Sequence, residues 1–455
     1  MIRRLVEKVQ TLFTRRPRER KPRLVAAAEH GIRRDRVPRS ALRVCETLQK
    51  AGHHAYIVGG AVRDLLLDVT PKDFDVATDA TPEQIKPHFR RAIIIGRRFR
   101  LVHVMFGSET IEVSTYRAAA NGEQAVDEHG RMLADNVFGS QADDAARRDF
   151  TINALYYDPS TETVIDYHDG VKDIKRRRLR MIGDPEARYR EDPVRMLRAV
   201  RFAAKLGFEI DEATRSPIAG MADLLGNVPP ARVFDEMLKL LTSGHSVACI
   251  LRLRAEGLHH GLLPLLDVIL EQPEGERFVM LALSRTDERV RAGKHIAVGF
   301  LFACLLWHEV LKRWKELQEA GQHRIPALDA AIDEMLNRQT EKLAIQRRFV
   351  ADMRDIWMMQ PRFERRSGRA PFALLSHLRL RAGYDFLALR GAAEEAPAEL
   401  VAWWHEFMHA DEAGRARLVS AAPAPGQGEG ARRRRRRRPK SAGGRADAAG
   451  GAAAS

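Results

Sequence analysis

The sequence has few cysteines and few aromatic residues, and it lacks any long apolar run. Its three cysteines, Cys45, Cys249 and Cys304, are widely separated along 455 residues, so we expect neither a disulfide framework nor a zinc site. No stretch approaches the roughly 18 apolar residues that a membrane span requires. With 7% aromatic, 45% hydrophobic and 30% charged residues, the composition is typical of a helix-rich globular protein, which we expect to be cytoplasmic.

Acidic residues are scarce at the two ends of the chain. The formal net charge is +15, and residues 1–40 carry 13 Lys and Arg against 4 Asp and Glu, while residues 431–455 carry 9 against 1. The remainder is nearly neutral. Basic arms of this kind are typical of segments that bind phosphate backbones, although acidic membrane surfaces attract them too. The tail, which includes seven arginines from Arg432 to Arg438, cannot bury apolar surface and is predicted to be disordered.

Short strands with few helices between them are expected in the first part of the chain. Apolar patterns predict strands near 56–58, 74–76, 92–95, 101–106 and 110–115. Helices are expected at 40–50, where Ser40 could act as the cap, and after Thr81. Strands this close together predict a small mixed or antiparallel sheet. From about residue 149 the pattern is helical, including 151–157 and a helix at 193–206 that Gly207 should end, so the predicted fold class is α+β.

Gly59 and Gly60 lie between an expected strand and an expected helix. Two glycines at such a turn let backbone N–H groups approach a triphosphate, and the helix N-terminus adds a favourable field for anions. Arg63, one turn further on, could reach the same phosphates. Taken alone, the pair is explained equally well by a helix start that merely needs glycine.

Asp73 and Asp75 follow this turn and flank Phe74. Because side chains alternate along a strand, we expect both carboxylates on one face and Phe74 in the core. Two carboxylates this close repel each other, and a divalent cation, Mg²⁺ or alternatively Mn²⁺, would offset that cost. Two such ions would activate an attacking hydroxyl and stabilise departing pyrophosphate. A pair of solvated aspartates is the alternative, but the glycine turn before them favours the metal site.

Glu112 lies between Ile111 and Val113 in a later expected strand. A carboxylate among apolar neighbours is either an ordinary exposed-face residue or a third acid beside the aspartate pair. The sheet expected here favours the third acid, so we predict Glu112 as a further metal ligand.

A group of polar residues marks the point where the sheet gives way to helix. Asp149 follows Arg147 and Arg148, and Asn153 lies one turn later. Asp149 could simply cap a helix. An aspartate beside two arginines also suits a nucleotide, because the carboxylate can accept from a ribose hydroxyl while the guanidinium groups bind phosphates.

Asp192 precedes a proline and a helix that carries Arg195 and Arg198 at steps of three residues. Asp192 is expected to cap this helix. A surface ion pair between Asp192 and Arg195 is one interpretation. A pair that reads the edge of an incoming base, in the absence of a template, is the other.

These four elements, in this order and spacing, resemble the class II nucleotidyltransferases, which include bacterial CCA-adding enzymes and bacterial poly(A) polymerases. The resemblance implies a polymerase-β-like head, followed by all-helical neck, body and RNA-binding regions. It also implies metal binding by Asp73 and Asp75, a ribose contact by the active-site acid Asp149, and base selection by Asp192 and Arg195.

Within this class, residues 96–106, 135–139, 188–202, 382–390 and 403–404 are similar to bacterial poly(A) polymerases rather than to CCA-adding enzymes. The resemblance therefore implies template-independent addition of AMP from ATP to RNA 3′ ends. A CCA-adding enzyme, which shares all four elements, is the first alternative. A catalytically silent RNA-binding protein is the second.

The same reasoning predicts five regions and their partners. They are a basic arm (1–39), a catalytic head (40–180), a neck with the base-selecting helix (181–270), an RNA-binding body (271–420) and a disordered tail (421–455). RNA and ATP are the expected partners. The arginines of the tail would neutralise RNA phosphates and give strongly salt-dependent binding that does not depend on sequence.

Overall fold

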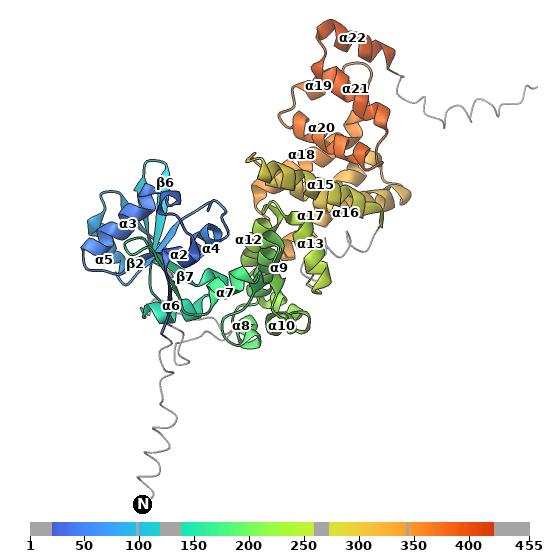
Figure 1. Cartoon of the computed structure of the whole chain (residues 1–455). Helices are drawn as coiled ribbons and strands as arrows, with labels where there is room; N and C mark the ends of the chain where they lie inside the picture. Colours follow the sequence, from blue (N-terminus) through green and yellow to red (C-terminus); the bar gives the residue numbers. More distant parts are fainter. Residues whose placement is uncertain (1–20, 97–99, 119–137, 259–272, 343–344, 423–455) are drawn as a thin grey trace, which may run out of the picture. The chain divides into compact units, whose positions relative to one another are not determined.

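The computed structural model describes residues 21–96, 100–118, 138–258, 273–342 and 345–422 (Figure 1). The chain divides into two compact units. The first comprises Met1–Asp267, Thr286–His295 and Lys342–Ala344, and the second Val268–Arg285, Ile296–Glu341 and Ile345–Ser455. The polyarginine tail and the first 20 residues of the predicted basic arm lie outside the described residues, so the predictions for them stay untested.

A mixed sheet of eight strands dominates the first unit, as predicted. Its strand order is β1-β8-β7-β2-β3-β6-β5-β4. The β3 and β6 strands pair in parallel and the other neighbours pair antiparallel. The strands are β1 (Arg23–Val25), β2 (Ala55–Val58), β3 (Asp75–Thr78), β4 (Ala92–Ile95), β5 (Leu101–Phe106), β6 (Glu109–Thr115), β7 (Leu155–Asp158) and β8 (Thr163–Asp166).

Two parts of the sheet differ from the sequence prediction. The expected helix at 151–157 is wrong, because only the short 3-10 helix η3 (Thr151–Asn153) forms before the chain enters β7. This strand pairs with both β2 and β8, and Leu155, Tyr156 and Tyr157 are fully buried. At the other edge, β1 lies within 1–39, so the sheet unit begins before the predicted head boundary at residue 40.

Short helices cover the sheet and a helical segment follows it. The helix α3 (Arg39–Lys50) contacts β2, β3 and β6. It begins after Pro38, and Ser40 is buried with no hydrogen bond to its hydroxyl, so the predicted Ser40 cap is wrong. The capping box at Thr81 is present, and Gly207 ends its helix in the left-handed conformation, both as predicted.

The remaining helices of the first unit include α2 (Ala27–His30), α4 (Gly60–Leu66), α5 (Pro82–Ile85), α6 (Gln141–Arg147), α7 (Gly170–Lys175), α8 (Pro185–Glu191), α9 (Val194–Leu206), α10 (Glu212–Arg215), α11 (Ile218–Met221), α12 (Pro230–Leu241) and α13 (Ser246–Ala255). The 3-10 helices are η1 (Arg34–Arg36), η2 (Lys86–His88) and η4 (Ala222–Asn227). A short parallel pair, β9 (Arg178–Leu179) with β10 (Glu209–Ile210), adds strand to a segment that was expected to be helical.

The described part of the second unit is helical. The helices from here to the end of the described chain are α15 (Pro273–Arg291), α16 (Val298–Glu319), α17 (Arg324–Lys342), α18 (Arg347–Phe363), α19 (Ala370–Leu375), α20 (Leu380–Ala392), α21 (Ala398–His409) and α22 (Glu412–Ala421). Aromatic residues hold them together; Phe363 and Trp404, for example, pack edge to face with ring centroids 4.9 Å apart. Among the described helices, none is both long and apolar enough to span a membrane.

Candidate active site

The acidic residues predicted to bind metal gather where β3 and β6 run in parallel. Asp75 is the first residue of β3 and stands in register with Glu112 of β6. Asp73 lies two residues earlier, just outside the strand, and the intervening Phe74 is buried as predicted. Parallel pairing therefore places Glu112 beside Asp75, as the third-acid prediction requires.

Desolvation and neighbouring charges change the ionisation of Asp75. Although Asp75 reaches solvent, surrounding protein atoms partly desolvate its carboxyl group. This desolvation, followed by the neighbouring Glu112 and Asp73, raises the pKa of Asp75 to about 6, while Arg148 opposes the rise. A cation bound between such carboxylates would remove their repulsion. Oxygen ligands of this kind are those that Mg²⁺ prefers, so the donor set fits a divalent ion.

The acids are not arranged as a complete ligand set. Within the described ranges, no group of three or more His, Cys, Asp and Glu side chains is close enough to hold a metal ion. On the other side of β6, His103 of β5 stands in register with Glu112, and its Nε2 lies 3.6 Å from a Glu112 carboxylate oxygen. This histidine was not predicted; the strand alternation of 101–106 places it on the face of Glu112.

The glycine turn between β2 and α4 depends on Gly59. Gly59 has φ 74° and ψ −124°, a combination that residues with a Cβ atom adopt only with strain. A Cβ atom there would also lie 3.2 Å from Nη1 of Arg148. The guanidinium of Arg148 therefore lies directly against the backbone of Gly59.

Arg148 is held in this position by the residues around it. Its Nη2 donates to Asp144 at 3.0 Å, and its guanidinium lies 5.4 Å from the centroid of the Tyr156 ring. The Tyr156 hydroxyl donates to the same Asp144 oxygen at 2.7 Å. A cation fixed over a glycine turn is well suited to bind a phosphate group.

We predict that Gly59→Ala lowers the melting temperature and reduces catalysis. The forced backbone conformation costs about 1 to 3 kcal/mol, and the methyl group displaces Arg148. Gly60→Ala is the matched control, because Gly60 starts α4 without a positive φ and its Cβ would meet Arg63 only at an ordinary 3.6 Å. Thermal melting of both variants measures this difference. Equal melting temperatures for the two variants would contradict the requirement for glycine at position 59.

Arg63 is hydrogen-bonded to neighbouring side chains in this structure. It is buried in α4, where Nη1 donates to Oδ1 of Asn153 at 2.6 Å, and Nε and Nη2 donate to Oδ1 of Asp64 at 2.8 and 2.7 Å. The contact between Arg63 and the triphosphate stays a prediction, and it would require these hydrogen bonds to be shared or exchanged. Its present contacts fix the position of Asn153.

The Asp149 carboxylate accepts four hydrogen bonds from described residues. One carboxylate oxygen accepts from the Phe150 backbone N–H at 2.7 Å and from Asn153 Nδ2 at 3.0 Å. The other accepts from Nε and Nη2 of Arg198 at 2.8 and 2.6 Å. Burial opposes ionisation, but Arg198 and Asn153 together hold the pKa of Asp149 below its usual value. Asp149 and Asn153 are thus brought together as predicted, and Arg198 joins them.

A chain of alternating charges continues from Asp149 into the helical segment. Arg198 Nη1 lies 3.8 Å from buried Glu236 on α12, and Arg201 Nε donates to Glu236 at 2.6 Å. The Phe202 ring lies within 5.4 Å of the guanidinium carbons of Arg63, Arg198 and Arg201. One network of hydrogen bonds and ion pairs thus connects Asp64, Arg63, Asn153, Asp149, Arg198, Glu236 and Arg201. Glu236 and Phe202 were not predicted, because no local pattern connects them with Asp149.

Asp192 and Arg195 do not pair with each other. Asp192 precedes α9, and its carboxylate accepts from Arg232 of α12 at 2.9 Å. Arg195 donates to Glu191 at 2.7 Å and to the Arg188 carbonyl at 2.8 Å. The N-cap of α9 is Pro193, so the predicted Asp192 cap is wrong, although its carboxylate accepts from the Val194 N–H at 3.3 Å.

Comparison with known proteins agrees with this fold. Residues 55–180 match the family described as Poly A polymerase head domain, 207–270 match Probable RNA and SrmB- binding site of polymerase A, and 320–440 match Polymerase A arginine-rich C-terminus. The chain is 46% identical to Poly(A) polymerase I of Haemophilus influenzae over 407 residues, which covers 87% of this chain and 90% of that protein.

CCA-adding enzymes are also similar, but less closely. The chain is 36% identical to the CCA-adding enzyme of Bacillus velezensis over 276 residues, covering 60% of this chain and 67% of that protein. The crystal structure of the Bacillus stearothermophilus CCA-adding enzyme in complex with CTP is similar with a TM-score of 0.55 and 26% identity, over 84% of this chain and 82% of that one.

The mixed sheet, the glycine turn and the acidic group define a nucleotidyltransferase of the class that includes CCA-adding enzymes and poly(A) polymerases. Within that class, the higher identity and the three matched regions separate the two groups. The chain belongs to the bacterial poly(A) polymerase family.

Proposed function

We propose that this chain adds AMP from ATP to RNA 3′ ends without a template. The observation that carries the proposal is the acidic group of Asp73, Asp75 and Glu112 beside the Gly59 turn, within a head of the poly(A) polymerase family. Similarity to Poly(A) polymerase I along most of the chain supports this function over CCA addition. RNA and ATP as substrates, and three buried free cysteines, also support our proposal of a cytoplasmic location.

A divalent cation is part of the proposal. Asp73 and Asp75, with Glu112 as a third acid, would hold it, and we propose Mg²⁺ with Mn²⁺ as the alternative. When bound, the cation would neutralise triphosphate charge and favour ionisation of the attacking hydroxyl.

The residues of the chain position the reactants around this acidic group. The Gly59 and Gly60 backbone would approach the triphosphate, and Arg148, fixed over that turn, would bind its charge. The RNA 3′-oxygen forms a bond with the α-phosphorus of ATP, while the bond between the α-phosphorus and the oxygen that bridges it to the β-phosphorus breaks. Pyrophosphate leaves, and one AMP is added to the RNA.

Nucleotide recognition is proposed for the second group of residues. Asp149 and Asn153 would contact the sugar, and Asp192 with Arg195 would read the base edge. Because Asp192 is paired with Arg232 and Arg195 with Glu191, binding would require these contacts to be shared or exchanged. Arg198 would keep Asp149 ionised and oriented for the sugar.

Incorporation of each of the four nucleotides separates this function from its alternatives. We expect ATP alone to give long A tracts on a generic single-stranded RNA, with little incorporation of CTP, GTP or UTP. Arrest after CCA on a tRNA that lacks its 3′ end, with no A tract on the generic RNA, would instead identify a CCA-adding enzyme. Failure to incorporate any nucleotide with Mg²⁺ or Mn²⁺ would indicate an RNA-binding protein with a silent head.

A further inference from the structure

Two histidines lie one turn apart on α21, in the second unit. His405 and His409 are both exposed, and their spacing of four residues places them on one face of the helix. Their ring centroids lie 4.5 Å apart, with the ring planes tilted by 33°. Two imidazoles at this spacing on one helix can bind the same metal ion. The acids proposed to hold Mg²⁺ belong to the first unit, so this pair is a separate feature.

The His409 ring is held in an orientation that suits a metal ligand. Its Nδ1 lies 2.7 Å from the backbone carbonyl oxygen of His405. Because a carbonyl oxygen can only accept a hydrogen bond, Nδ1 carries a proton and donates it. In the neutral ring Nε2 then keeps its lone pair. Histidines that bind metal ions commonly have this arrangement, in which one ring nitrogen donates to a carbonyl and the other binds the metal.

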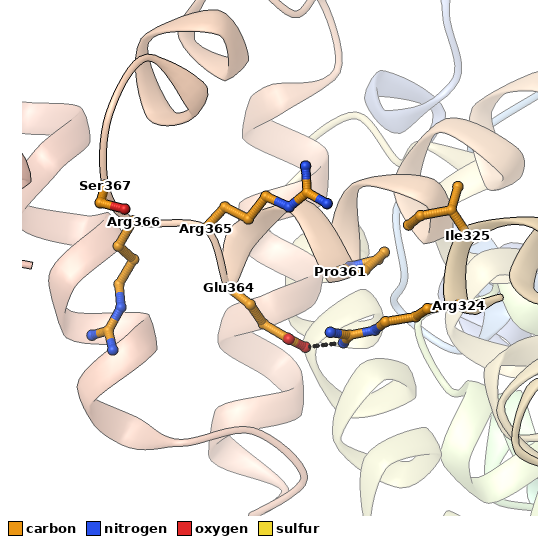
Figure 2. A pocket seen from close by; sticks show the side chains of 7 residues that line it. All are labelled: Arg324, Ile325, Pro361, Glu364, Arg365, Arg366 and Ser367. Carbon is orange, nitrogen blue, oxygen red and sulfur yellow. Dashed lines mark hydrogen bonds and ion pairs between the residues drawn. The ribbon is translucent and has the colours of Figure 1, made fainter. Parts of the chain in front are cut away.

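The charge around this pair favours a cation. Residues 391–414 contain six acidic residues and no Lys or Arg, in a chain whose net charge is +15. His409 is the last residue of α21, and the partial negative charge at a helix C-terminus adds to the attraction. Another hollow of the same unit shows the opposite charge (Figure 2). Its lining includes Arg324, Arg365 and Arg366 with one acid, Glu364, so it would repel a cation.

Imidazole donors determine the class of cation. Mg²⁺ and Ca²⁺ prefer oxygen ligands, whereas imidazole nitrogen suits Zn²⁺, Cu²⁺ and Ni²⁺. Since the described residues contain no group of three or more His, Cys, Asp and Glu side chains that could hold a metal ion, the pair would supply two ligands and leave the other positions open. His405 also lines a hollow of about 440 Å³ formed by residues of α20 and α21. This hollow gives room for water or a small ligand at the open positions.

We propose that His405 and His409 form an open binding site for one late first-row transition-metal cation, with Zn²⁺ as the cation to test. Nε2 of His409 and one ring nitrogen of His405 bind the ion, and water molecules complete its coordination. The site differs from the proposed Mg²⁺ site in its donor atoms and in the unit that carries it. The proposal concerns metal binding alone, so it does not depend on whether the chain transfers AMP.

The test measures Zn²⁺ binding to the full-length protein by isothermal titration calorimetry, with excess Mg²⁺ present to occupy sites made of oxygen ligands. We expect the original protein to bind one more Zn²⁺ ion than the double variant His405→Gln/His409→Gln. Each single variant should bind this ion at least about tenfold more weakly, because one of the two ligands is lost. Both side chains are exposed, so the metal-free variants should melt at the same temperature as the original protein.

The matched control is His323→Gln/His377→Gln. It removes two histidines of the same unit that lie in separate connections, one before α17 and one between α19 and α20. We expect this control to bind as many Zn²⁺ ions as the original protein. Equal Zn²⁺ binding by the original protein and by the His405→Gln/His409→Gln variant would overturn the proposal. Equal losses in the two double variants would overturn it as well, because histidines in general would then account for the binding.

Electron paramagnetic resonance with Cu²⁺ identifies the donor atoms directly. We expect the original protein, with one equivalent of Cu²⁺, to show splitting by imidazole nitrogens that is lost in His405→Gln/His409→Gln. A spectrum that these substitutions leave unchanged would place the ion elsewhere and contradict the proposal. Displacement of bound Zn²⁺ by excess Mg²⁺ would contradict it too, since oxygen ligands would then hold the ion.

Discussion

Asp75→Asn is expected to lower AMP incorporation by at least about 1,000-fold, which corresponds to a loss of roughly 4 kcal/mol of transition-state stabilisation. Asparagine keeps the shape of the side chain but removes the negative charge that a divalent cation requires. Because Glu112 and Asp73 repel the Asp75 carboxylate, the metal-free variant should melt at the same temperature as the original protein or higher. Loss of activity together with retained stability would locate the defect in chemistry rather than in folding.

Asp79→Asn is the control for this experiment. Asp79 follows the opposite end of β3, is exposed, and accepts from the His54 N–H at 2.8 Å, a contact that asparagine can keep. Its incorporation rate should stay within about twofold of the original rate. Asp75→Asn should also bind RNA normally, since the charge contacts that hold RNA lie elsewhere in our proposal. Incorporation by Asp75→Asn within tenfold of the original rate would contradict the metal assignment.

The strands could be predicted from the sequence wherever apolar and polar residues alternate within a single strand. Strands such as β5 and β6 alternate apolar and polar residues, and their predicted limits agree with the structure to within one residue. The sequence predicts a helix where β7 forms, because this strand lies between two strands and is buried on both faces, which removes the alternation that would identify it.

The candidate site shows the same division between local and distant contacts. The parallel pairing of β3 with β6 agrees with the placement of Glu112 beside Asp75, which strand alternation had suggested. By contrast, Arg63 meets Asn153 across 90 positions and Asp149 meets Arg198 across 49. A single sequence gives no signal for such pairs. Their partners became visible only when the fold brought them together.

Spacing along the chain did not identify the partners of Asp192 and Arg195. Three residues separate them, which suggests neighbours on one helix face. The helix begins only at Val194, however, so Asp192 is not part of it. Arg195 instead donates to Glu191 at the end of α8, and Arg232 of α12 donates to Asp192. The break between α8 and α9 thus gives the two side chains different partners, which spacing alone does not show.

Arg198→Met is expected to destabilise the first unit by about 3 kcal/mol at neutral pH, because it leaves Asp149 buried and ionised without its cation. That loss corresponds to a melting temperature lower by roughly 6 to 12 °C. AMP incorporation should fall as well, since Asp149 is proposed to contact the sugar. Calorimetry is the suitable measurement because it resolves the transitions of separate units.

The pH dependence identifies the cause of this destabilisation. In the original protein the lowered pKa of Asp149 gives stability that is present above the unfolded pKa of about 3.9 and is lost as the pH falls through the folded pKa. In Arg198→Met, burial would raise the pKa of Asp149. The free-energy cost of burying its ionised carboxylate therefore exists at neutral pH and disappears as Asp149 takes up a proton. The difference in melting temperature should therefore shrink between pH 7.5 and pH 4.5.

Arg198→Met/Asp149→Asn distinguishes a lost ion pair from lost packing. Asparagine removes the buried charge while its side-chain oxygen can still accept from the Phe150 N–H, so the double variant should recover at least half of the lost melting temperature at pH 7.5. Activity should stay low, because the double variant offers no carboxylate to the sugar. A double variant no more stable than Arg198→Met, with a difference independent of pH, would mean that Arg198 contributes through its contact with Phe202 rather than through Asp149.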